Sequence, residues 1–251
     1  MKVAISQPTY LPWLGYLDLI AQVDTFVFLD TVQFEKQSWQ QRNRIKSPNG
    51  LQLLTVPVAG KGRFPQFLRN VEISGTQFRR KHLRAVEMNY GRSRFFKVYF
   101  SSLCSLLESL PLDTRLVDLN ARLIEWFMQV LGIRTPLLRS SSLVQRGRRV
   151  ELLASLCQTL GANCYISPIG SAGYLLPELR FFSERAVEVV FQHYEHPQYR
   201  QLFPPFCPYA STLDLIFNEG GCSLEVLRSG RRAPLLPDQV AKGRTAGVGV
   251  W

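Results

Sequence analysis

The sequence predicts an α/β protein with a three-layer, mostly parallel, Rossmann-like sheet and a helical insertion. Two observations support this fold class. Short apolar runs alternate with amphipathic segments of ten to thirteen residues, which is the order of elements in βαβ units. The runs are continuously apolar, and this is typical of parallel strands that are buried on both faces.

A βαβ unit is expected at the start of the chain. Residues 2–6 (KVAIS) predict a strand, residues 15–23 a short helix, and residues 25–30 (TFVFLD) a buried strand. Residues 51–58 (LQLLTVPV) then predict an edge strand or a hairpin.

A helical insertion is expected from about residue 76 to residue 132. Its last helix has the clearest pattern, because Leu116, Leu119, Leu123 and Phe127 form one apolar stripe and Gly132 follows the last turn.

The second half of the chain repeats the alternation of strands and helices. Strands are expected at 135–140, 163–167 and 187–192, and helices at 148–160, 175–186 and 211–220. Residues 231–251 lose this periodicity, so we expect a flexible tail after a single α/β domain that covers residues 1–230.

Composition limits the class of protein. No apolar run has the length of a membrane span, and the start of the chain lacks the pattern of a secretory signal, so we expect a cytoplasmic location. The five cysteines lack metal-ligand spacing and predict reduced thiols, and no metal site is predicted.

The net charge of +11 arises from several short basic clusters, among them QQRNRIK, FRRKHLR and QRGRR. Such clusters suit a nucleic acid, a phosphorylated small molecule or an anionic membrane surface, and a solvated basic surface explains each of them as well.

A ligand site is expected where the strands end, because ligands of open α/β sheets bind beyond the carboxyl ends of the strands. Segments rich in polar and aromatic residues follow five of the predicted strands. The candidate substrate-binding residues are Gln7, Tyr10, Trp13, Gly15, Tyr16, Arg42, Asn43, Arg44, His82, Ser167, Gly170, Tyr174, Asn218 and Glu219.

The segment QPTYLPWLGY supplies the aromatic part of this expected site. Tyr10, Trp13 and Tyr16 either wall a pocket and stack on a base or sugar, or simply pack the start of the helix. Gly15 begins that helix, whose free backbone N–H groups attract anions. Arg42 and Arg44 share one face of an extended segment and suit a phosphate or carboxylate.

The candidates for acid–base catalysis are His193, Asp30 and His196. Asp30 ends a predicted strand, and the two histidines follow another one, so all three are expected at the same edge. His82 lies in a basic helical segment, where it either contacts an anionic ligand or occupies the boundary of the core.

Several common motifs are absent from the sequence. It has no GxxxxGK[ST], no GxGxxG and no GxSxG. The segment WLGY stands where nucleotidyltransferases have HxGH, but its histidines are missing, so adenylyl transfer does not follow from the position alone.

The sequence resembles the WbqC-like family from about residue 3 to residue 221. The resemblance rests on QPTYLPWLGYLDLI, FVFLDTVQFEKQSWQQRNRIKSPNG, LTVPV, KHLRAVEMNY, RSSSL, YISPIGSAGY, HPQYRQ and STLDLIFNEG. Gln41, Phe78 and Pro168 depart from the usual family pattern, and Pro168 stiffens a loop in which the family commonly has glycine.

The resemblance implies a bacterial cytoplasmic protein of surface-polysaccharide (O-antigen) biosynthesis. We therefore expect a transferase that adds a small acyl or aminoacyl group to a nucleotide-activated amino sugar. A carboxylate-activating enzyme that uses ATP and a non-catalytic basic binding protein remain as alternatives. The expected partners are a phosphorylated small molecule and polysaccharide-assembly proteins, rather than nucleic acid. A nucleotide or nucleotide sugar is the candidate cofactor.

Overall fold

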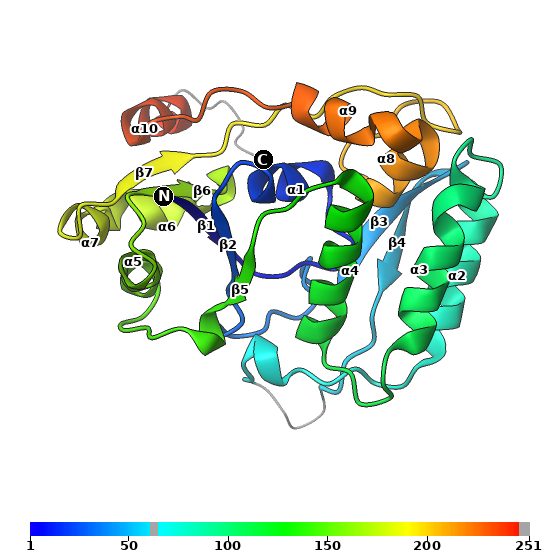
Figure 1. Ribbon diagram of the computed structural model, residues 1–251, viewed down its shortest axis with the longest axis horizontal. Coiled ribbons are helices and arrows are strands. Elements are labelled where there is room, and N and C mark those ends of the chain that lie inside the picture. The colour runs from blue at the N-terminus through cyan, green and yellow to red at the C-terminus, as the bar shows by residue number, and fades with distance from the viewer. Residues whose placement is uncertain (61–64, 246–251) are drawn as a thin grey trace.

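A computed structural model describes residues 1–60 and 65–245 of the chain. Its centre is a sheet of five parallel strands in the order β5-β2-β1-β6-β7, as Figure 1 shows. The strands are β1 (Lys2–Ser6), β2 (Thr25–Phe28), β5 (Leu137–Arg139), β6 (Cys164–Ser167) and β7 (Glu188–Phe191). The predicted fold class is therefore confirmed.

The strand side chains divide the interior into two cores, as a three-layer fold requires. Ala4, Phe26 and Ile166 belong to one core, and Val3, Val27 and Tyr165 belong to the other. These residues alternate along each strand, so each strand is buried on both faces. This explains why the strands read as continuous apolar runs.

Different helices cover the two faces of the sheet. The first core holds residues of α1 (Leu14–Ile20), α2 (Gln77–Tyr90), α3 (Phe96–Ser109), α4 (Leu116–Leu131), α8 (Thr212–Glu219) and α9 (Ser223–Ser229). The second holds residues of α5 (Val150–Thr159), α6 (Ala172–Leu175), α7 (Arg180–Ser183) and α10 (Pro237–Thr245). The helix predicted at 175–186 is broken into short turns around Pro177.

A separate antiparallel hairpin joins β3 (Arg42–Ser47) to β4 (Gly50–Thr55). It lies beside α8 and the pair α2–α3, away from the main sheet (Figure 1). Ile45 and Leu54 are buried in the first core, so the hairpin is anchored by one apolar face.

The C-terminal segment differs from the flexible tail that the sequence predicts. Leu235 forms a bridge with Phe191 of β7, α10 packs against the same strand, and Val240 is buried. Tertiary contacts thus order a segment that has no strong local pattern of its own. Residues 246–251 of the predicted tail lie outside the described residues.

Candidate functional site

The strand order indicates where a ligand site is expected. Along the chain the five strands run first toward β5 and then, from β1, toward β7, so the direction of winding reverses between β1 and β6. Ligands of doubly wound sheets bind in the crevice at such a reversal, outside the carboxyl ends of the strands. Ser6 and Ser167 are the last residues of these two strands.

The loops on the two sides of this reversal differ in accessibility. Gln7 follows β1, is half-buried, and accepts a hydrogen bond from the Nε2 of Gln40. Ser167 is buried and is hydrogen-bonded to Ser171. Gly170 is exposed, and an added Cβ there would meet no atom within 4 Å. The open backbone at Gly170 is therefore accessible to a ligand.

Asp30 ties two neighbouring strands together. Its Oδ1 accepts hydrogen bonds from the Ser140 Oγ at 2.8 Å and the Ser141 backbone N at 2.9 Å, and its Oδ2 accepts one from the Ser141 Oγ at 2.6 Å. The side chain is buried. These bonds connect the end of β2 to the turn after β5, so the geometry gives Asp30 a structural task in addition to its predicted catalytic one.

Aromatic rings surround His196 beside the carboxyl edge of the sheet. We call Trp13, Tyr194, His196, Tyr199, Phe206 and Tyr209 the His196 cluster. The His196 ring stacks on Trp13 with a centroid distance of 6.3 Å and meets the edge of Tyr209 at 5.3 Å. The cluster thus joins the loop after β1 to the segment after β7.

The imidazole of His196 has one nitrogen occupied and one free. Its Nδ1 lies 2.9 Å from the carbonyl oxygen of Pro197, which can only accept, so Nδ1 carries the hydrogen. Burial lowers the pKa of His196 and favours the neutral ring. The Nε2 is buried and finds no hydrogen-bond partner among the described residues. It therefore carries a lone pair that no described residue satisfies.

His193 has a different environment from His196. Its side chain is half-exposed, and its Nε2 lies 3.8 Å from Glu195 Oε1. The other carboxylate oxygen of Glu195 pairs with Arg232 Nη2 at 2.6 Å. His193 thus lies at the surface beside the Glu195–Arg232 ion pair, whereas His196 is packed among aromatic rings.

The basic residues of β3 present one accessible arginine. Arg44 is exposed, and its guanidinium lies 5.0 Å from the ring centroid of Trp39, which is itself exposed. Arg42 is half-buried. Asn43 points the opposite way, where its Nδ2 donates to the carbonyl oxygens of Tyr10 and Leu11 and fixes the loop after β1.

Three predicted pocket residues are placed in the core. Tyr10 is fully buried, and its hydroxyl lies 2.7 Å from His82 Nδ1. Burial lowers the pKa of His82 to about 4, so this histidine is neutral at neutral pH. Tyr16 is also buried, and its hydroxyl donates to the carbonyl oxygen of Gln7. These three side chains therefore belong to the core and are not exposed for contact with a ligand.

Gly15 is explained by the position of Trp13. A Cβ at Gly15 would lie 2.2 Å from the Trp13 ring, so the indole lies directly over the first turn of α1. The glycine therefore lets the indole pack close to the helix, next to Tyr194 and Tyr209.

The remaining predicted residues lie at different places. Tyr174 is exposed on α6, after β6. Asn218 and Glu219 end α8, where the Asn218 Nδ2 donates to the carbonyl oxygen of Asp214 and Glu219 Oε1 accepts from the backbone N of Arg200. The first contact lies within α8, and the second ties α8 to the segment that follows β7.

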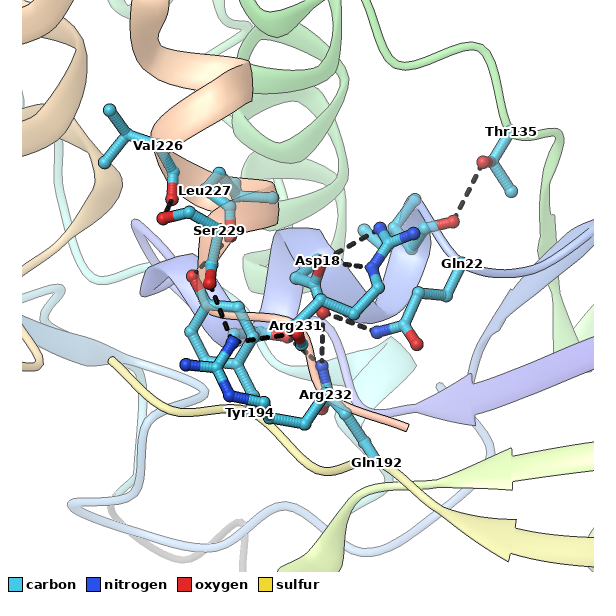
Figure 2. Close-up of polar contacts among 12 residues, drawn as sticks. Asp18, Gln22, Thr135, Gln192, Tyr194, Val226, Leu227, Ser229, Arg231 and Arg232 are labelled. Atoms are coloured by element: carbon cyan, nitrogen blue, oxygen red, sulfur yellow. Dashed lines mark hydrogen bonds and ion pairs between the residues drawn. The ribbon is translucent and has the colours of Figure 1, made fainter. Parts of the chain in front are cut away.

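A buried acid that the sequence analysis did not select lies under the site. Asp18 of α1 pairs with the Nη2 of Arg231 at 2.9 Å and accepts from the Nε2 atoms of Gln22 and Gln192 (Figure 2). Burial raises the pKa of Asp18, and the charge of Arg231 opposes this rise. Gln192 also donates to the carbonyl oxygen of Gly15 at 2.8 Å, which locks the β7 loop to α1. The long separation of Asp18 and Arg231 in sequence gave no signal for this pair.

Two absences apply to the described part of the chain, residues 1–60 and 65–245. No group of three or more His, Cys, Asp and Glu side chains is arranged to hold a metal ion. No helix there combines the length and apolar character needed to cross a membrane.

Comparison with known proteins places the chain in a family. The model of the WbqC-like protein family matches residues 7–225. The chain is also 40% identical over 235 residues to "Uncharacterized protein Rv1507c" of Mycobacterium tuberculosis (strain ATCC 25618 / H37Rv), covering 92% of this chain and 99% of that protein. No solved structure matches the chain. The chain belongs to the WbqC-like protein family.

Proposed function

We propose that this protein is a transferase that adds a small acyl or aminoacyl group to the amine of a nucleotide-activated amino sugar. The observation that carries the proposal is the His196 cluster, which joins the loop after β1 to the segment after β7 and leaves Nε2 without a partner among the described residues. We place the reaction in bacterial surface-polysaccharide biosynthesis, in the cytoplasm, because nucleotide sugars are made and used there.

Recognition would divide the substrate between two places. The nucleotide would lie over the open backbone at Gly170, and Arg44, the exposed arginine of β3, would bind an anionic group of the substrate. The sugar would lie against Trp13 and Tyr209, because sugar rings present C–H faces that pack on aromatic rings.

The chemistry would use the free nitrogen of His196. The amine nitrogen attacks the carbonyl carbon of the acyl donor, and its proton passes to Nε2, which is the unprotonated nitrogen of the neutral ring. The carbonyl then re-forms as the leaving group departs, and His196 returns the proton to that group or to water. His193 and Asp30 remain candidates, but Asp30 already accepts three hydrogen bonds.

A thermal-shift screen against nucleotides, nucleotide sugars and ATP tests the binding half of this proposal. A ligand at a hundred times its Kd adds about 2.7 kcal/mol of apparent stability, which such a screen detects. Gly170→Val is expected to fold, since open space surrounds its Cβ, and to lose the shift. Arg44→Ala is expected to weaken it.

Matched controls separate loss of binding from general damage. Gly221→Val also enters open space, and Arg84→Ala removes an exposed cation from α2, so both should keep the full shift. A shift with ATP alone, together with release of pyrophosphate in the presence of an amino acid, would favour a carboxylate-activating enzyme instead. No shift with any nucleotide sugar would contradict the proposed transferase.

A further inference from the structure

A fully buried lysine ends on a cysteine sulfur. Lys46 of β3 is only 1% exposed, and its Nζ lies 3.3 Å from the Sγ of Cys207. The nearby carboxylate of Asp214 interacts with Lys46 electrostatically, but its Oδ2 already accepts hydrogen bonds from Tyr199 at 2.7 Å and Gln201 at 2.8 Å. The lysine nitrogen and the thiol are therefore left as direct neighbours.

The thiol is held in place and is partly open to solvent. The backbone N of Cys207 donates to Gln201 Oε1 at 2.8 Å, and the Nε2 of Gln201 donates to the carbonyl oxygen of Cys207 at 2.9 Å. These two bonds fix the residue opposite the lysine. Cys207 is partly exposed, so a small oxidant can reach its sulfur while Lys46 stays enclosed behind it.

We propose that Lys46 and Cys207 form a reversible covalent cross-link, Nζ–O–Sγ, when the protein meets hydrogen peroxide. In the first step the thiol is oxidised to a sulfenic acid, and one peroxide is reduced to water. In the second step the neutral amine and the sulfenic acid lose two hydrogens to a second peroxide, which forms the N–O bond and releases two waters. Sulfur and nitrogen each lose two electrons. Reduction by a dithiol restores the free amine and thiol.

The cross-link would control the wall of the candidate site. Cys207 lies between Phe206 and Tyr209, which both contact His196. Joining its sulfur to β3 would fix this segment to the hairpin and limit its movement. The chemistry needs only the geometry of the two side chains, so the cross-link does not depend on the proposed transferase activity.

Peptide mapping by mass spectrometry tests the cross-link. We would treat the full-length Cys222→Ser protein with hydrogen peroxide, because Cys207 and Cys222 share the tryptic peptide 201–228. The expected product is this peptide joined to peptide 45–61, with uncleaved Lys46 and the mass of one oxygen more and two hydrogens less than the sum. Dithiothreitol should return both free peptides.

Two variants keep the test decisive. Cys207→Ser should abolish the joined peptide. Lys46→Met, which retains an apolar stem of similar length, should divert Cys207 to sulfinic and sulfonic acids. Oxidation of Cys207 in the Lys46-containing protein to these acids without any joined peptide would overturn the proposal, and so would complete resistance of the thiol to peroxide.

Discussion

At the scale of single residues, His82 and His196 show how one residue type takes two tasks. Both are screened from water and both have a lowered pKa. His82 is hydrogen-bonded to the Tyr10 hydroxyl and interacts with the backbone of Thr55, so its ring is satisfied within the core. His196 keeps one nitrogen without a protein partner. Hydrogen-bond satisfaction, rather than burial, separates the structural histidine from the functional candidate.

His82 should make stability depend on pH. Its pKa is about 4 in the folded protein and about 6.5 when unfolded, so the unfolded chain binds the extra proton first as the pH falls. Stability is therefore complete above about pH 6.5 and decreases by up to about 3 kcal/mol toward pH 4. Urea unfolding at pH 7 and at pH 4.5 measures this difference.

The pH dependence of the wild type does not report on His82 alone. The pKa values of Asp18 and Asp214 are raised in the folded protein, so these two groups make the folded state more stable as the pH falls, which opposes the effect of His82. The effect of His82 is measured by comparing the wild type with His82→Gln. This variant should be less stable than the wild type at pH 7, but its free energy of unfolding should fall less between pH 7 and pH 4.5. His193→Gln, at a half-exposed position, should keep the wild-type slope. Equal slopes in the wild type and His82→Gln would contradict the assignment.

Replacement of His196 by phenylalanine tests its proposed role as the base. His196→Phe keeps a ring among Trp13, Tyr199 and Tyr209, so the melting temperature should change little. Loss of Nε2 should reduce acyl transfer to the amino sugar by about 10²–10⁴-fold and leave binding nearly unchanged. Calorimetry and a product assay measure the two effects separately. A variant with normal turnover would remove His196 from the mechanism.

Asp30 should contribute to stability whatever its role in catalysis. Asp30→Ala removes the acceptor of three hydrogen bonds and leaves the buried Ser140 hydroxyl without it, so we expect a loss of about 3 kcal/mol in chemical unfolding. Ser141→Ala removes one of these donors and should cost about 1–2 kcal/mol. If Asp30→Ala were as stable as the wild type, the tie between β2 and β5 would be unimportant.

The sequence could place only part of the candidate site. It selects Trp13 and His196, whose rings stack on each other in the structure, but it gives Tyr10 and His82 the same status. A fully buried tyrosine and a ligand-facing one have the same local pattern, because the difference depends on helix α2, which lies far along the chain. The contact between Lys46 and Cys207 could not be predicted from the sequence either, because the two residues are 161 positions apart and only the fold brings them together.

At the scale of elements, the buried strands were predicted, and β4 overlaps the edge strand or hairpin predicted at 51–58, whereas β3 was expected only as an extended segment. All five strands of the main sheet coincide with apolar runs in the sequence. The strand β3 (RNRIKS) carries polar residues at most positions, because its side chains contact loops and buried charges rather than a uniform apolar layer. Its sequence therefore lacks the apolar pattern from which its pairing with β4 could have been predicted.

The segment after residue 230 illustrates how tertiary contacts override local pattern. Arg231 neutralises Asp18, whose side chain is fully buried, and the bridge at Leu235 extends the edge of β7. Removing residues 231–251 would leave the Asp18 carboxylate buried without its cation, a change that typically costs about 3–5 kcal/mol. Truncation after residue 230 is therefore expected to lower the melting temperature strongly.

A second truncation provides the control. Ending the chain after residue 245 keeps α10 and every contact described for Arg231, Leu235 and Val240, and should leave stability unchanged. In the chain that ends after residue 245, Arg231→Met should reproduce most of the stability lost by truncation after residue 230. Adding Asp18→Asn to Arg231→Met should restore part of that stability, because it removes the unpaired buried charge. Equal melting temperatures for the two truncations would show that the predicted flexible tail describes this segment better.

At the scale of the whole molecule, the order of the strands carries the functional argument. The sequence predicts which segments are strands, but it does not fix their order, and only the order β5-β2-β1-β6-β7 locates the reversal between β1 and β6. The exposed basic residues that the structure describes do not gather at this reversal or at any other single place. Arg80, Lys81 and Arg84 lie on α2, and Arg146, Arg148 and Arg149 precede α5 at the opposite end of the molecule (Figure 1).

This dispersed charge leads to a prediction about salt. With a net charge of +11, the protein should bind duplex DNA at low ionic strength by neutralising several phosphates, and the logarithm of the binding constant should fall with that of salt at a slope of about −4 or steeper. A nucleotide sugar carries only about two phosphate charges and lacks the condensed counterions of duplex DNA, so its binding should depend much less steeply on salt. Fluorescence anisotropy at salt concentrations across the physiological range measures both slopes. Tight DNA binding that persists at physiological salt, combined with no nucleotide-sugar binding, would instead make this a nucleic-acid-binding protein, because dispersed surface charge alone does not produce salt-resistant affinity.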